Sequence, residues 1–458
     1  MKRRRFAATV LCFAALAAAG AGLLPVPAAA SVSSKISSIL QKHGVAGGST
    51  GVYVWDFDAA GQVFASHADT RLAPASTMKL VTTSSALGSW GPQHRFKTEL
   101  YGPDVPVYGG VLYGDLYLKG FGDPSLSTLS YQRQVLHLTT ASFESFAKRL
   151  RALKVRKVTG RVLGDESWFD KKRTGASWTS GLQLECGPLS ALTGNESLRD
   201  GNRVKDPARY AAKLLTEALR ANGIKVTGKP GAGTVPATAR LFKRQFSAPL
   251  RRLLQRMDKD SDNFFAEIML KGLGKDFYEE GSTQAGLEVS RATLAAVGLD
   301  PASYRLLDGS GLSYADRLTA RDLVRILGAA RQDVDYDDYY DALAVAGRDG
   351  TLEDRMRGTA AADNAHAKTG TLNIAVCLSG YVKSANDRLV GYAILVNGGS
   401  VNWANAAAAQ DDIVEMLAAA RLAGARQIRV TPVLRQHPLS AFEAVNPVGS
   451  YLQAVVQP

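Results

Sequence analysis

The sequence predicts an α+β protein in which a five-stranded antiparallel sheet, with helices on both faces, is interrupted by an inserted α+β domain. Three observations predict this architecture. A strand hairpin and a helix precede residue 91, short strands separated by Gly and Asp fill residues 91–248, and helices followed by three strands fill residues 249–424. Because strands that are distant in sequence can close one sheet, we expect the early hairpin beside the three late strands.

The first residues of the 458-residue chain are typical of a secretory signal peptide. Met1–Arg5 is basic, Phe6–Leu24 is apolar, and Ala28–Ala30 matches a small-residue cleavage site. We therefore expect residues 1–30 to be removed on export to the periplasm or the extracytoplasmic cell wall. A membrane anchor formed by the same apolar run is the alternative. Because no later stretch has 18 consecutive apolar residues, no stable membrane anchor is expected elsewhere.

Composition narrows the classes of partner and cofactor. The formal net charge of +13 suits a polyanionic surface such as a bacterial wall, although solubility alone explains it equally well. No block of Lys and Arg with interleaved aromatic residues is present, so nucleic acid is not an expected partner. Only Cys186 and Cys377 follow the signal peptide, and Cys377 lies in an apolar strand, where we expect a buried free thiol. No metal-ligand spacing is present, so no metal is expected.

The N-terminal part of the predicted sheet comes from alternating residues. Gly51–Phe57 and Gln62–Ser66 alternate in polarity around a turn, which predicts a hairpin. Pro74 then opens a helix with apolar residues at helical spacing. Ser76 falls in or near the first turn of that helix, where backbone N–H groups favour developing negative charge.

The remaining elements follow in order. In the inserted domain, a helix over Pro207–Asn222 ends at Gly223. Two long helices come next, and then three strands and a final helix; their predicted ranges are Pro249–Leu273, Thr283–Val297, Ala365–Gly370, Ala375–Val382, Leu389–Asn397 and Ala406–Ala423. Residues 425–458 carry four prolines and little periodicity, so we expect a C-terminal extension.

Three short motifs carry the predicted chemistry. Ser76-Thr77-Met78-Lys79 is an S-x-x-K pattern, residues 261–263 read Ser-Asp-Asn, and residues 368–371 read Lys-Thr-Gly-Thr. Each motif alone is weak, because each also occurs by chance. Together, in this order on helix, loop and strand, they form the set used by penicillin-recognising serine acyltransferases.

The residue types fit nucleophilic catalysis by serine. Residues i and i+3 share a helix face, so Lys79 can reach Ser76 and act as its base if burial and a second cation lower its pKa. Lys368 is the candidate second cation. Ser261 is placed to pass a proton between Lys79 and the leaving amine.

The same motifs suggest how substrate would be held. Asn263 can hold the substrate amide and orient Lys79. Lys368 and the hydroxyls of Thr369 and Thr371 would face a substrate carboxylate, and Gly370 would let the substrate backbone approach the strand. The backbone N–H groups of Ser76 and Thr371 are the natural oxyanion pair.

With these motifs, the chain resembles D-alanyl-D-alanine carboxypeptidase/endopeptidases of the penicillin-binding protein 4 type, the class C low-molecular-mass group. The likeness extends through "GDPSL", "PLSAL", "DGSGLS", "LTARDLVRIL" and "AGRDGTL" and covers most of residues 45–400. It implies a serine β-lactamase/DD-peptidase-like domain over residues 31–90 and 249–424, with residues 91–248 inserted. It also implies cleavage of D-Ala-D-Ala termini or D-Ala cross-links of peptidoglycan stem peptides, acylation by β-lactam antibiotics, and no cofactor.

Two departures from the family pattern concern the substrate side. Ser76 and Ser261 are closer in sequence than is usual in the family, so we expect a truncated insertion. An arginine that the resemblance associates with the third stem residue is replaced by Tyr314, so we assign Tyr314 to substrate binding and expect weaker selection for a free carboxylate there. Arg317 could substitute if the loop turns helically.

Two other functions stay open on the sequence alone. One is a β-lactamase or a D-amino-acid esterase or amidase on the same scaffold. The other is a non-catalytic wall-binding protein, which would have no need for all the motif residues. His366, Asp308 and Ser310 are interpreted as structural neighbours and loop residues that shape the pocket.

Overall fold

The computed structural model describes residues 28–104, 107–399 and 401–423. Most of the predicted signal peptide and the whole of the predicted extension over residues 425–458 lie outside the described residues. Within the described ranges, no helix combines the length and the apolar character needed to cross a membrane.

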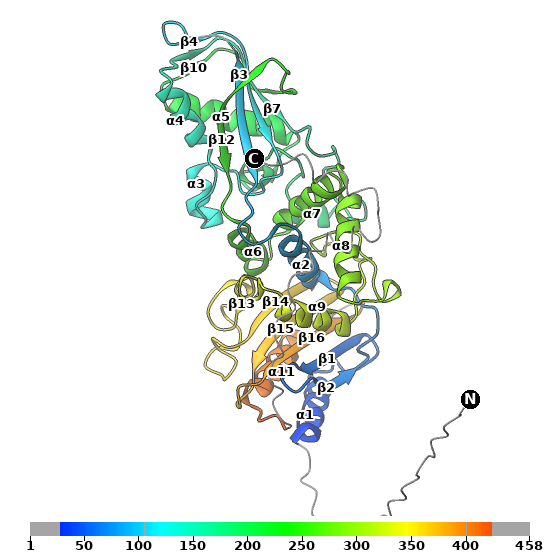
Figure 1. Cartoon of the computed structure of the whole chain (residues 1–458). Coiled ribbons are helices and arrows are strands. Elements are labelled where there is room, and N and C mark those ends of the chain that lie inside the picture. Colours follow the sequence, from blue (N-terminus) through cyan, green and yellow to red (C-terminus); the bar gives the residue numbers. More distant parts are fainter. Residues whose placement is uncertain (1–27, 105–106, 400, 424–458) are drawn as a thin grey trace, which may run out of the picture.

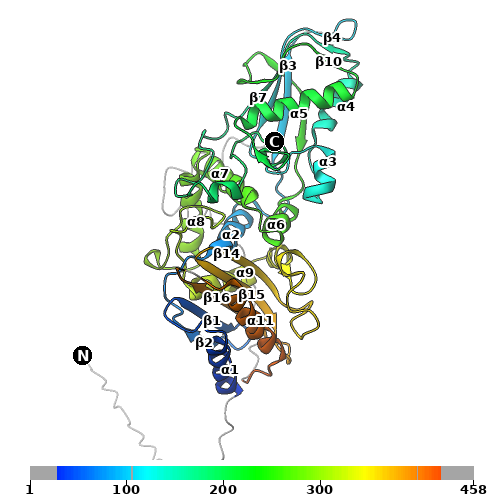
Figure 2. The ribbon, with the colours of Figure 1, turned by 180° about the vertical axis from the view of Figure 1, so that it is seen from behind.

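The molecule is elongated, with a sheet at each end and a layer of helices between them (Figure 1). The first and last strands of the sequence lie in the lower sheet, and the middle of the chain forms the upper sheet. The view from behind shows the same order (Figure 2). The helices between the two sheets are α2 (Lys79–Trp90), α6 (Leu250–Lys259), α7 (Asn263–Tyr278) and α8 (Thr283–Ala296). This junction is therefore built by one helix that ends just before residue 91 and by three that follow residue 248.

The lower sheet is antiparallel and has the strand order β13-β14-β15-β16-β1-β2. Its strands are β1 (Thr50–Asp56), β2 (Gly61–Ser66), β13 (Ala344–Val345), β14 (His366–Leu372), β15 (Ala375–Lys383) and β16 (Leu389–Asn397). Five of these strands are the predicted ones, so the α+β fold class is confirmed. The two-residue strand β13 was not predicted, because two residues are too few to show a period.

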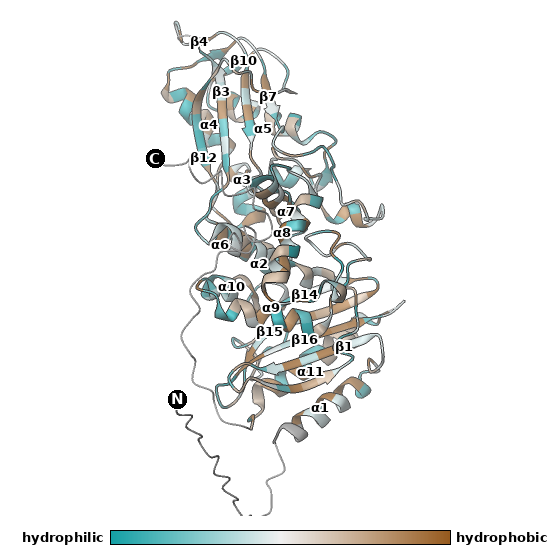
Figure 3. Ribbon diagram, turned by 45° about the vertical axis from the view of Figure 1, so that its right-hand side comes forward, coloured by the Kyte–Doolittle hydropathy of each residue, from teal (hydrophilic) through white to brown (hydrophobic). Residues whose placement is uncertain are grey.

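Helices cover both faces of the lower sheet. α1 (Ala28–Lys42) and α11 (Trp403–Ala419) lie on one face, while α9 (Ala320–Gln332) and the short 3₁₀ helix η1 (Ala75–Met78) contact the other. Behind them pack α2, α6, α7, α8 and α10, with the ranges Lys79–Trp90, Leu250–Lys259, Asn263–Tyr278, Thr283–Ala296 and Tyr336–Ala342. Short 3₁₀ turns η5 (Pro301–Ser303) and η6 (Gly350–Leu352) lie in the connecting loops. Figure 3 shows hydrophobic segments in the strands of this sheet and in α7, both inside the molecule.

The long helix predicted over Pro249–Leu273 is wrong, because the structure breaks it into α6 and α7. Ser261 lies in the break with φ +58°, a left-handed conformation that continues no helix. The Asp262 side chain then accepts a hydrogen bond from the Phe265 N–H and caps α7. Helical periodicity on both sides masked this cap, whose Asp is a preferred N-cap residue.

The upper part contains the five-stranded mixed sheet β11-β7-β5-β3-β12, the three-stranded sheet β10-β6-β4 and the hairpin β8-β9. The strands are β3 (Lys97–Pro103), β4 (Val111–Leu112), β5 (Leu116–Gly120), β6 (Lys157–Val158), β7 (Val162–Asp165), β8 (Leu198–Arg199), β9 (Asn202–Arg203), β10 (Lys225–Val226), β11 (Gly231–Ala232) and β12 (Ala239–Phe246). The helices are α3 (Leu129–Tyr131), the π-turn η2 (Gln132–Leu136), α4 (Phe143–Ala152), η3 (Leu182–Glu185), η4 (Asn195–Ser197) and α5 (Pro207–Ala221). The predicted helix from Pro207 is therefore confirmed.

The two ends share one hydrophobic core at the junction. Trp178 and Leu189 from the middle of the chain pack in the same buried cluster as Met78 of η1 and Phe264 of α7. Burying such residues on both sides of a junction favours a fixed arrangement of the two parts. Cys377 of β15 and Cys186 are both buried and unbridged, as expected for Cys377.

Candidate active site

The three motifs meet at the junction between the lower sheet and the helices. Ser76 lies in η1, Ser261 lies two residues before Asn263, the first residue of α7, and Lys368 lies on β14. Lys79 Nζ lies 2.9 Å from Ser76 Oγ and 2.7 Å from Asn263 Oδ1. Lys368 Nζ donates to Ser261 Oγ at 2.9 Å. Two adjacent hydrogen-bonded groups thus form: Lys79 joins Ser76 to Asn263, and Lys368 contacts Ser261.

The nucleophile turn is held by close packing against β14. Ala75 has φ +47°, which is strained for a residue with a side chain. A Cβ at Gly370 would lie 2.9 Å from both Pro74 O and Ser76 N, which is closer than a Cβ atom can approach backbone atoms. Gly370 therefore lets η1 approach the strand, in addition to any approach by substrate that the sequence suggested. The Ser76 N–H lies next to the strand segment that carries Thr371.

Lys79 is fully buried and its amine meets a third acceptor, Ser310 O, at 2.8 Å. Burial lowers the pKa of Lys79 to about 8, against the opposing influence of Asp258 and other buried carboxylates. At pH 7 this raises the neutral fraction of the amine by roughly 300-fold compared with an ordinary lysine. Lys79 can therefore serve as a proton acceptor near neutral pH.

The second cation lies close enough to act on the base. Burial and then the charge of Lys79 lower the pKa of Lys368 to about 7. Burial is the largest cause of the lowered pKa of Lys79. Because repulsion between two ammonium groups is mutual, protonation of either lysine disfavours protonation of the other.

The edge of β14 is open where substrate would bind. β13 pairs only with Ala367 and His366 of β14, so no described strand pairs with this edge from Lys368 onward. An open sheet edge can accept an extended peptide as an added strand. Thr371 is exposed there, and Thr369 Oγ1 donates to Thr351 Oγ1 at 2.8 Å. Since neighbouring residues of a strand alternate between its faces, both threonines lie on the face opposite to Lys368.

Several supporting groups were missed by sequence reasoning. Glu267 of α7 is fully buried, and its Oε1 accepts hydrogen bonds from the N–H groups of Gly309 and Ser310. Ser310 in turn offers its carbonyl to Lys79, so Glu267 fixes one of the three partners of the amine. The sequence did contain a signal for Glu267, because it is an acidic residue inside the apolar run of α7. An acid in such a position is rarely buried without polar partners.

A second buried acid lies beside the two lysines. Asp258 of α6 accepts a hydrogen bond from Thr83 Oγ1 at 2.6 Å. Burial raises the pKa of Asp258 to about 7, while Lys368, Thr83 and Lys79 oppose that change. Asp258 therefore supplies negative charge next to the lysines above about pH 7.

Residues between positions 91 and 248 also contribute to the site. Asn263 Nδ2 donates to Glu185 O at 3.0 Å, and Trp178 Nε1 donates to Asp308 Oδ2 at 2.7 Å. Asp308 also accepts from the N–H groups of Gly311 and Ser313. Asp308 and Ser310 thus build the loop beside Lys79, which agrees with their interpretation as pocket-shaping residues.

Two further residues named from the sequence lie around the cluster. The His366 ring stacks on Tyr340 with centroids 3.8 Å apart, and burial lowers its pKa to about 4, so it is a structural neighbour. Tyr314 is half-buried against the central core, in the loop that follows Ser310. None of the contacts among the described residues joins Tyr314 to Ser76 or Lys79, so its place in substrate binding stays a prediction.

Comparison with known proteins places this geometry in a family. The family model described as the D-Ala-D-Ala carboxypeptidase 3 (S13) family matches residues 32–193 and 186–420. The D-alanyl-D-alanine carboxypeptidase of Actinomadura sp. (strain R39) is 29% identical over 456 aligned positions, covering 80% of each chain. Carboxypeptidase DacB of Mycolicibacterium smegmatis is 28% identical over 75% of each chain.

A solved structure shares the fold. Penicillin-binding protein 4 (dacB) from Haemophilus influenzae superimposes with a TM-score of 0.69 at 21% identity, covering 82% of this chain and 98% of that one. At that identity the likeness supports the fold alone, and the family match supports the activity. The chain therefore belongs to the D-Ala-D-Ala carboxypeptidase 3 (S13) family and is a serine-type D-Ala-D-Ala carboxypeptidase.

Proposed function

We propose that the protein is an exported DD-peptidase that cleaves peptidoglycan stem peptides through an acyl-enzyme on Ser76. The observation that carries this proposal is the arrangement of three acceptors around the Lys79 amine, at 2.9, 2.7 and 2.8 Å. A neutral amine has two N–H donors and one lone pair. Its two N–H groups can serve Asn263 Oδ1 and Ser310 O, which leaves the lone pair to accept the Ser76 hydroxyl proton.

In the acylation step, Ser76 Oγ attacks the carbonyl carbon of the penultimate D-Ala while Lys79 takes the hydroxyl proton. The N–H groups of Ser76 and Thr371 would stabilise the oxyanion of the tetrahedral intermediate. The C–N bond then breaks, and the proton passes through Ser261 to the leaving amine of the terminal D-Ala. Water attacks the ester in the second half-reaction, which releases the shortened peptide and restores the Ser76 hydroxyl.

Substrate binding follows from the open edge of β14 and the charges beside it. The peptide would lie along the edge from Lys368 onward, with Asn263 on its amide. Lys368 would meet the terminal carboxylate, and Thr369 and Thr371 would contact the peptide from the other face of the strand edge. Lys368 would also bind the carboxylate of a β-lactam, whose leaving amine stays attached to the acyl-enzyme after the ring opens. We therefore propose inhibition by β-lactams, and we propose D-Ala cross-links as a second class of substrate.

The domain organisation is also a proposal. Residues 31–90 and 249–424 would form the peptidase domain and residues 91–248 the accessory domain, with the signal peptide before and the extension after them. The strands between residues 97 and 246 all belong to the upper sheets or the β8-β9 hairpin, which supports this division.

The proposal is tested by labelling with a fluorescent penicillin. The wild-type protein should form a stable covalent adduct, and Ser76→Ala should form none while it keeps its circular dichroism spectrum and its melting temperature. Rapid turnover of the adduct would instead favour a β-lactamase, and no adduct with the wild type would favour a wall-binding protein. Digestion of purified muropeptides, with products identified by mass, separates carboxypeptidase from endopeptidase activity.

A further inference from the structure

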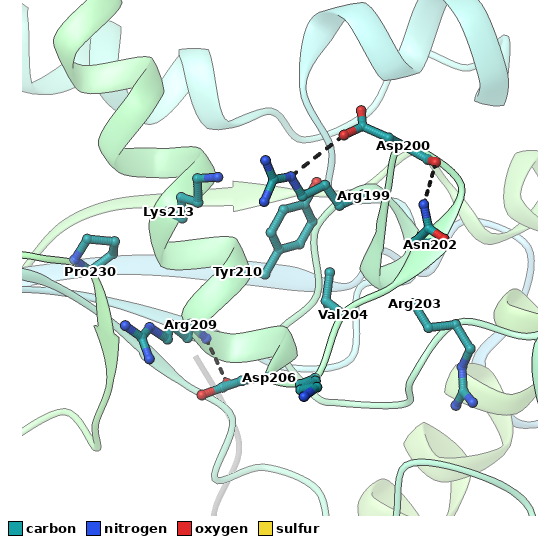
Figure 4. Close-up of a pocket in the computed structure, with 11 residues that line it drawn as sticks. Arg199, Asp200, Asn202, Arg203, Val204, Asp206, Arg209, Tyr210, Lys213 and Pro230 are labelled. Atoms are coloured by element: carbon teal, nitrogen blue, oxygen red, sulfur yellow. Dashed lines mark hydrogen bonds and ion pairs between the residues drawn. The ribbon is translucent and has the colours of Figure 1, made fainter.

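A cavity lies in the upper part of the molecule, beside the first turns of α5. Its volume is about 660 Å³, which is large enough for a sugar or polyol unit with a charged substituent. None of the three catalytic motifs lines it. Figure 4 shows Arg199, Arg209, Tyr210 and Lys213 around the same open space. We refer to it below as the basic groove.

The sequence builds one wall of the groove from a single face of α5. Asp206, Arg209, Tyr210 and Lys213 follow the spacing of one helix face, while Ala208, Ala211 and other small or apolar residues of the opposite face are buried. The helix thus turns its polar face to the groove.

The other wall comes from the β8-β9 hairpin. Asp200 and Gly201 form its turn with φ +51° and +75°, the positive values that tight two-residue hairpins require. Arg199 directly precedes this turn and Lys205 follows β9, and both residues line the groove. Two elements that pack side by side therefore present cations to one space.

The charges of the groove are poorly neutralised. Arg199 lies 3.7 Å from Asp200, and the two side chains are 62% and 88% exposed, so that pair contributes little. Lys213 lies 3.6 Å from Glu217, which is one turn further along α5 and is not part of the groove lining. Arg209 and Lys205 form no ion pair with any residue that the structure describes.

The acids of the groove do not compensate. Asp206 accepts a hydrogen bond from the Arg209 backbone N–H and caps α5. Together with Asp200 it gives the lining two carboxylates, against the four cations of Arg199, Lys205, Arg209 and Lys213. The Arg203 side chain points away from these residues (Figure 4). A net positive groove therefore remains after the local pairs are counted.

The groove also has an apolar part. The half-buried Tyr210 ring lies between the cations, and Val204 and Pro230 complete the lining. A ligand with an apolar ring or carbon chain and repeated negative groups matches both features. Guanidinium groups bind phosphate and carboxylate oxygens through paired N–H donors.

We propose that the basic groove binds an anionic polymer of the cell envelope, made of sugar or polyol units that carry phosphodiester or carboxylate groups. The location of such a polymer rests on the export proposed above, but the binding chemistry is independent of the peptidase site. Binding would hold the enzyme on the wall while the peptidase domain meets stem peptides.

The test uses the full mature protein at about 0.15 M salt, where weak surface attraction is screened. Binding is measured by titration against a poly(glycerol phosphate), a polyglucuronate and a neutral dextran of similar length. The groove variant carries Arg209→Gln and Lys213→Gln. The matched control carries Lys148→Gln and Arg151→Gln, which remove the same charges from the exposed side of α4.

The wild type should bind at least one anionic polymer and not dextran. The groove variant should lose affinity by at least roughly tenfold and show a smaller salt dependence, because fewer counterions are released. The control variant should stay within about twofold. Loss on the phosphate polymer alone or on the carboxylate polymer alone identifies the group recognised, and loss on both supports the shared chemistry.

Two results would overturn the proposal. In one, the control variant loses as much affinity as the groove variant, so that overall charge explains binding. In the other, the wild type binds neither anionic polymer more tightly than dextran. Penicillin labelling of Ser76 should be unchanged in both variants, so failure of the groove proposal is distinguishable from failure of the peptidase proposal.

Discussion

Lys79 Nζ lies between Ser76 Oγ and Ser310 O, which Glu267 holds through the Ser310 N–H. The amine is therefore oriented by a buried carboxylate that does not touch it. Because the position of the base depends on both its burial and its acceptors, changes at several residues should affect proton transfer without touching the nucleophile.

Replacing the base while keeping a positive charge should stop acylation. Lys79→Arg keeps a cation, but a guanidinium does not release its proton near neutral pH. We expect the acylation rate to fall by about 10²–10⁴, the usual range for loss of a general base. The measurement is stopped-flow acylation by a chromogenic β-lactam. Lys275→Arg on α7, whose amine meets the backbone of Glu279, is the matched control. Acylation by Lys79→Arg within a few-fold of wild type would require another base.

The pH dependence of acylation should follow the pKa of Lys79. Only the neutral amine accepts a proton, so the rate at saturating β-lactam should rise with pH through a midpoint near about 8. The Asp258 carboxylate favours the ammonium form of Lys79. Asp258→Asn should therefore lower the pKa of Lys79 and move the rise to lower pH. The effect should be seen mainly above pH 7, because burial raises the pKa of Asp258 to about 7.

The control for this shift is Asp337→Asn, which removes an equal charge from an exposed position on α10. Its pH profile should coincide with that of the wild type. A rise that moves to higher pH in Asp258→Asn would mean that Asp258 acts on the lysines in some way other than as a negative charge.

The inserted stretch should position the Ser261–Asn263 segment through Glu196. Glu196 lies 3.8 Å from Arg256, which also pairs with Asp262 at 3.2 Å. Residues 195–197 all have positive φ, a costly conformation that holds Glu196 at this position. Burial and the Asp262 charge raise the pKa of Glu196 well above its usual value, so a neutral amide should replace it well.

We therefore expect Glu196→Gln to acylate within about threefold of wild type. Glu196→Ala should be slower by roughly tenfold, because it removes the side-chain hydrogen bond between Glu196 and the Asp262 carboxylate. Melting temperatures measured alongside separate positioning from stability. Equal rates for the Ala variant and the wild type, or equal losses for both variants, would contradict this positioning role.

The elements and the motifs of the peptidase part could be predicted from the sequence, but the shape of the helices around the site could not. Strand β1 shows a strand pattern in sequence, strands β15 and β16 are short, mostly apolar runs that are buried along almost their whole length, and helix α5 follows helical spacing. The break at Ser261 follows no such pattern, because apolar residues at helical spacing continue from α6 into α7. The side chain of the left-handed residue Ser261 accepts a hydrogen bond from Lys368, which lies on a strand distant in sequence. A contact of this kind cannot be read from the local sequence.

The supporting shell of the site could be predicted least. The motifs identify Ser76, Lys79 and Lys368 because they are read as short patterns. Glu267 and Asp258 act through loops and strands far away in sequence, and helical periodicity treats them as interruptions of an apolar face. Glu185 could not be predicted either, because its backbone carbonyl, not its side chain, accepts the hydrogen bond from Asn263. Any residue type can supply a backbone carbonyl, so the sequence does not identify such a contact.

The last prediction concerns the third residue of the stem peptide. Tyr314 stands where the family resemblance implies an arginine for the diaminopimelate carboxylate. A phenol can donate one hydrogen bond but lacks the paired donors and the charge of a guanidinium. Arg317 is a poor substitute, because its Nη1 donates to Tyr314 O at 2.8 Å and to Asp316 O at 2.7 Å. We therefore expect weak selection for a free carboxylate at this residue.

The measurement uses three matched peptides ending in D-Ala-D-Ala, with diaminopimelate, its amide or lysine in third place. We expect kcat/KM values within roughly tenfold of one another, a gap of about 1.4 kcal/mol. Tyr314→Arg should raise the preference for the free carboxylate, whereas Tyr314→Phe should leave the ranking unchanged, since neither Tyr nor Phe carries a charge. A wild-type preference of a thousandfold or more for the free carboxylate would show that another cation binds it, and Arg317→Gln would then identify or exclude Arg317 as that cation.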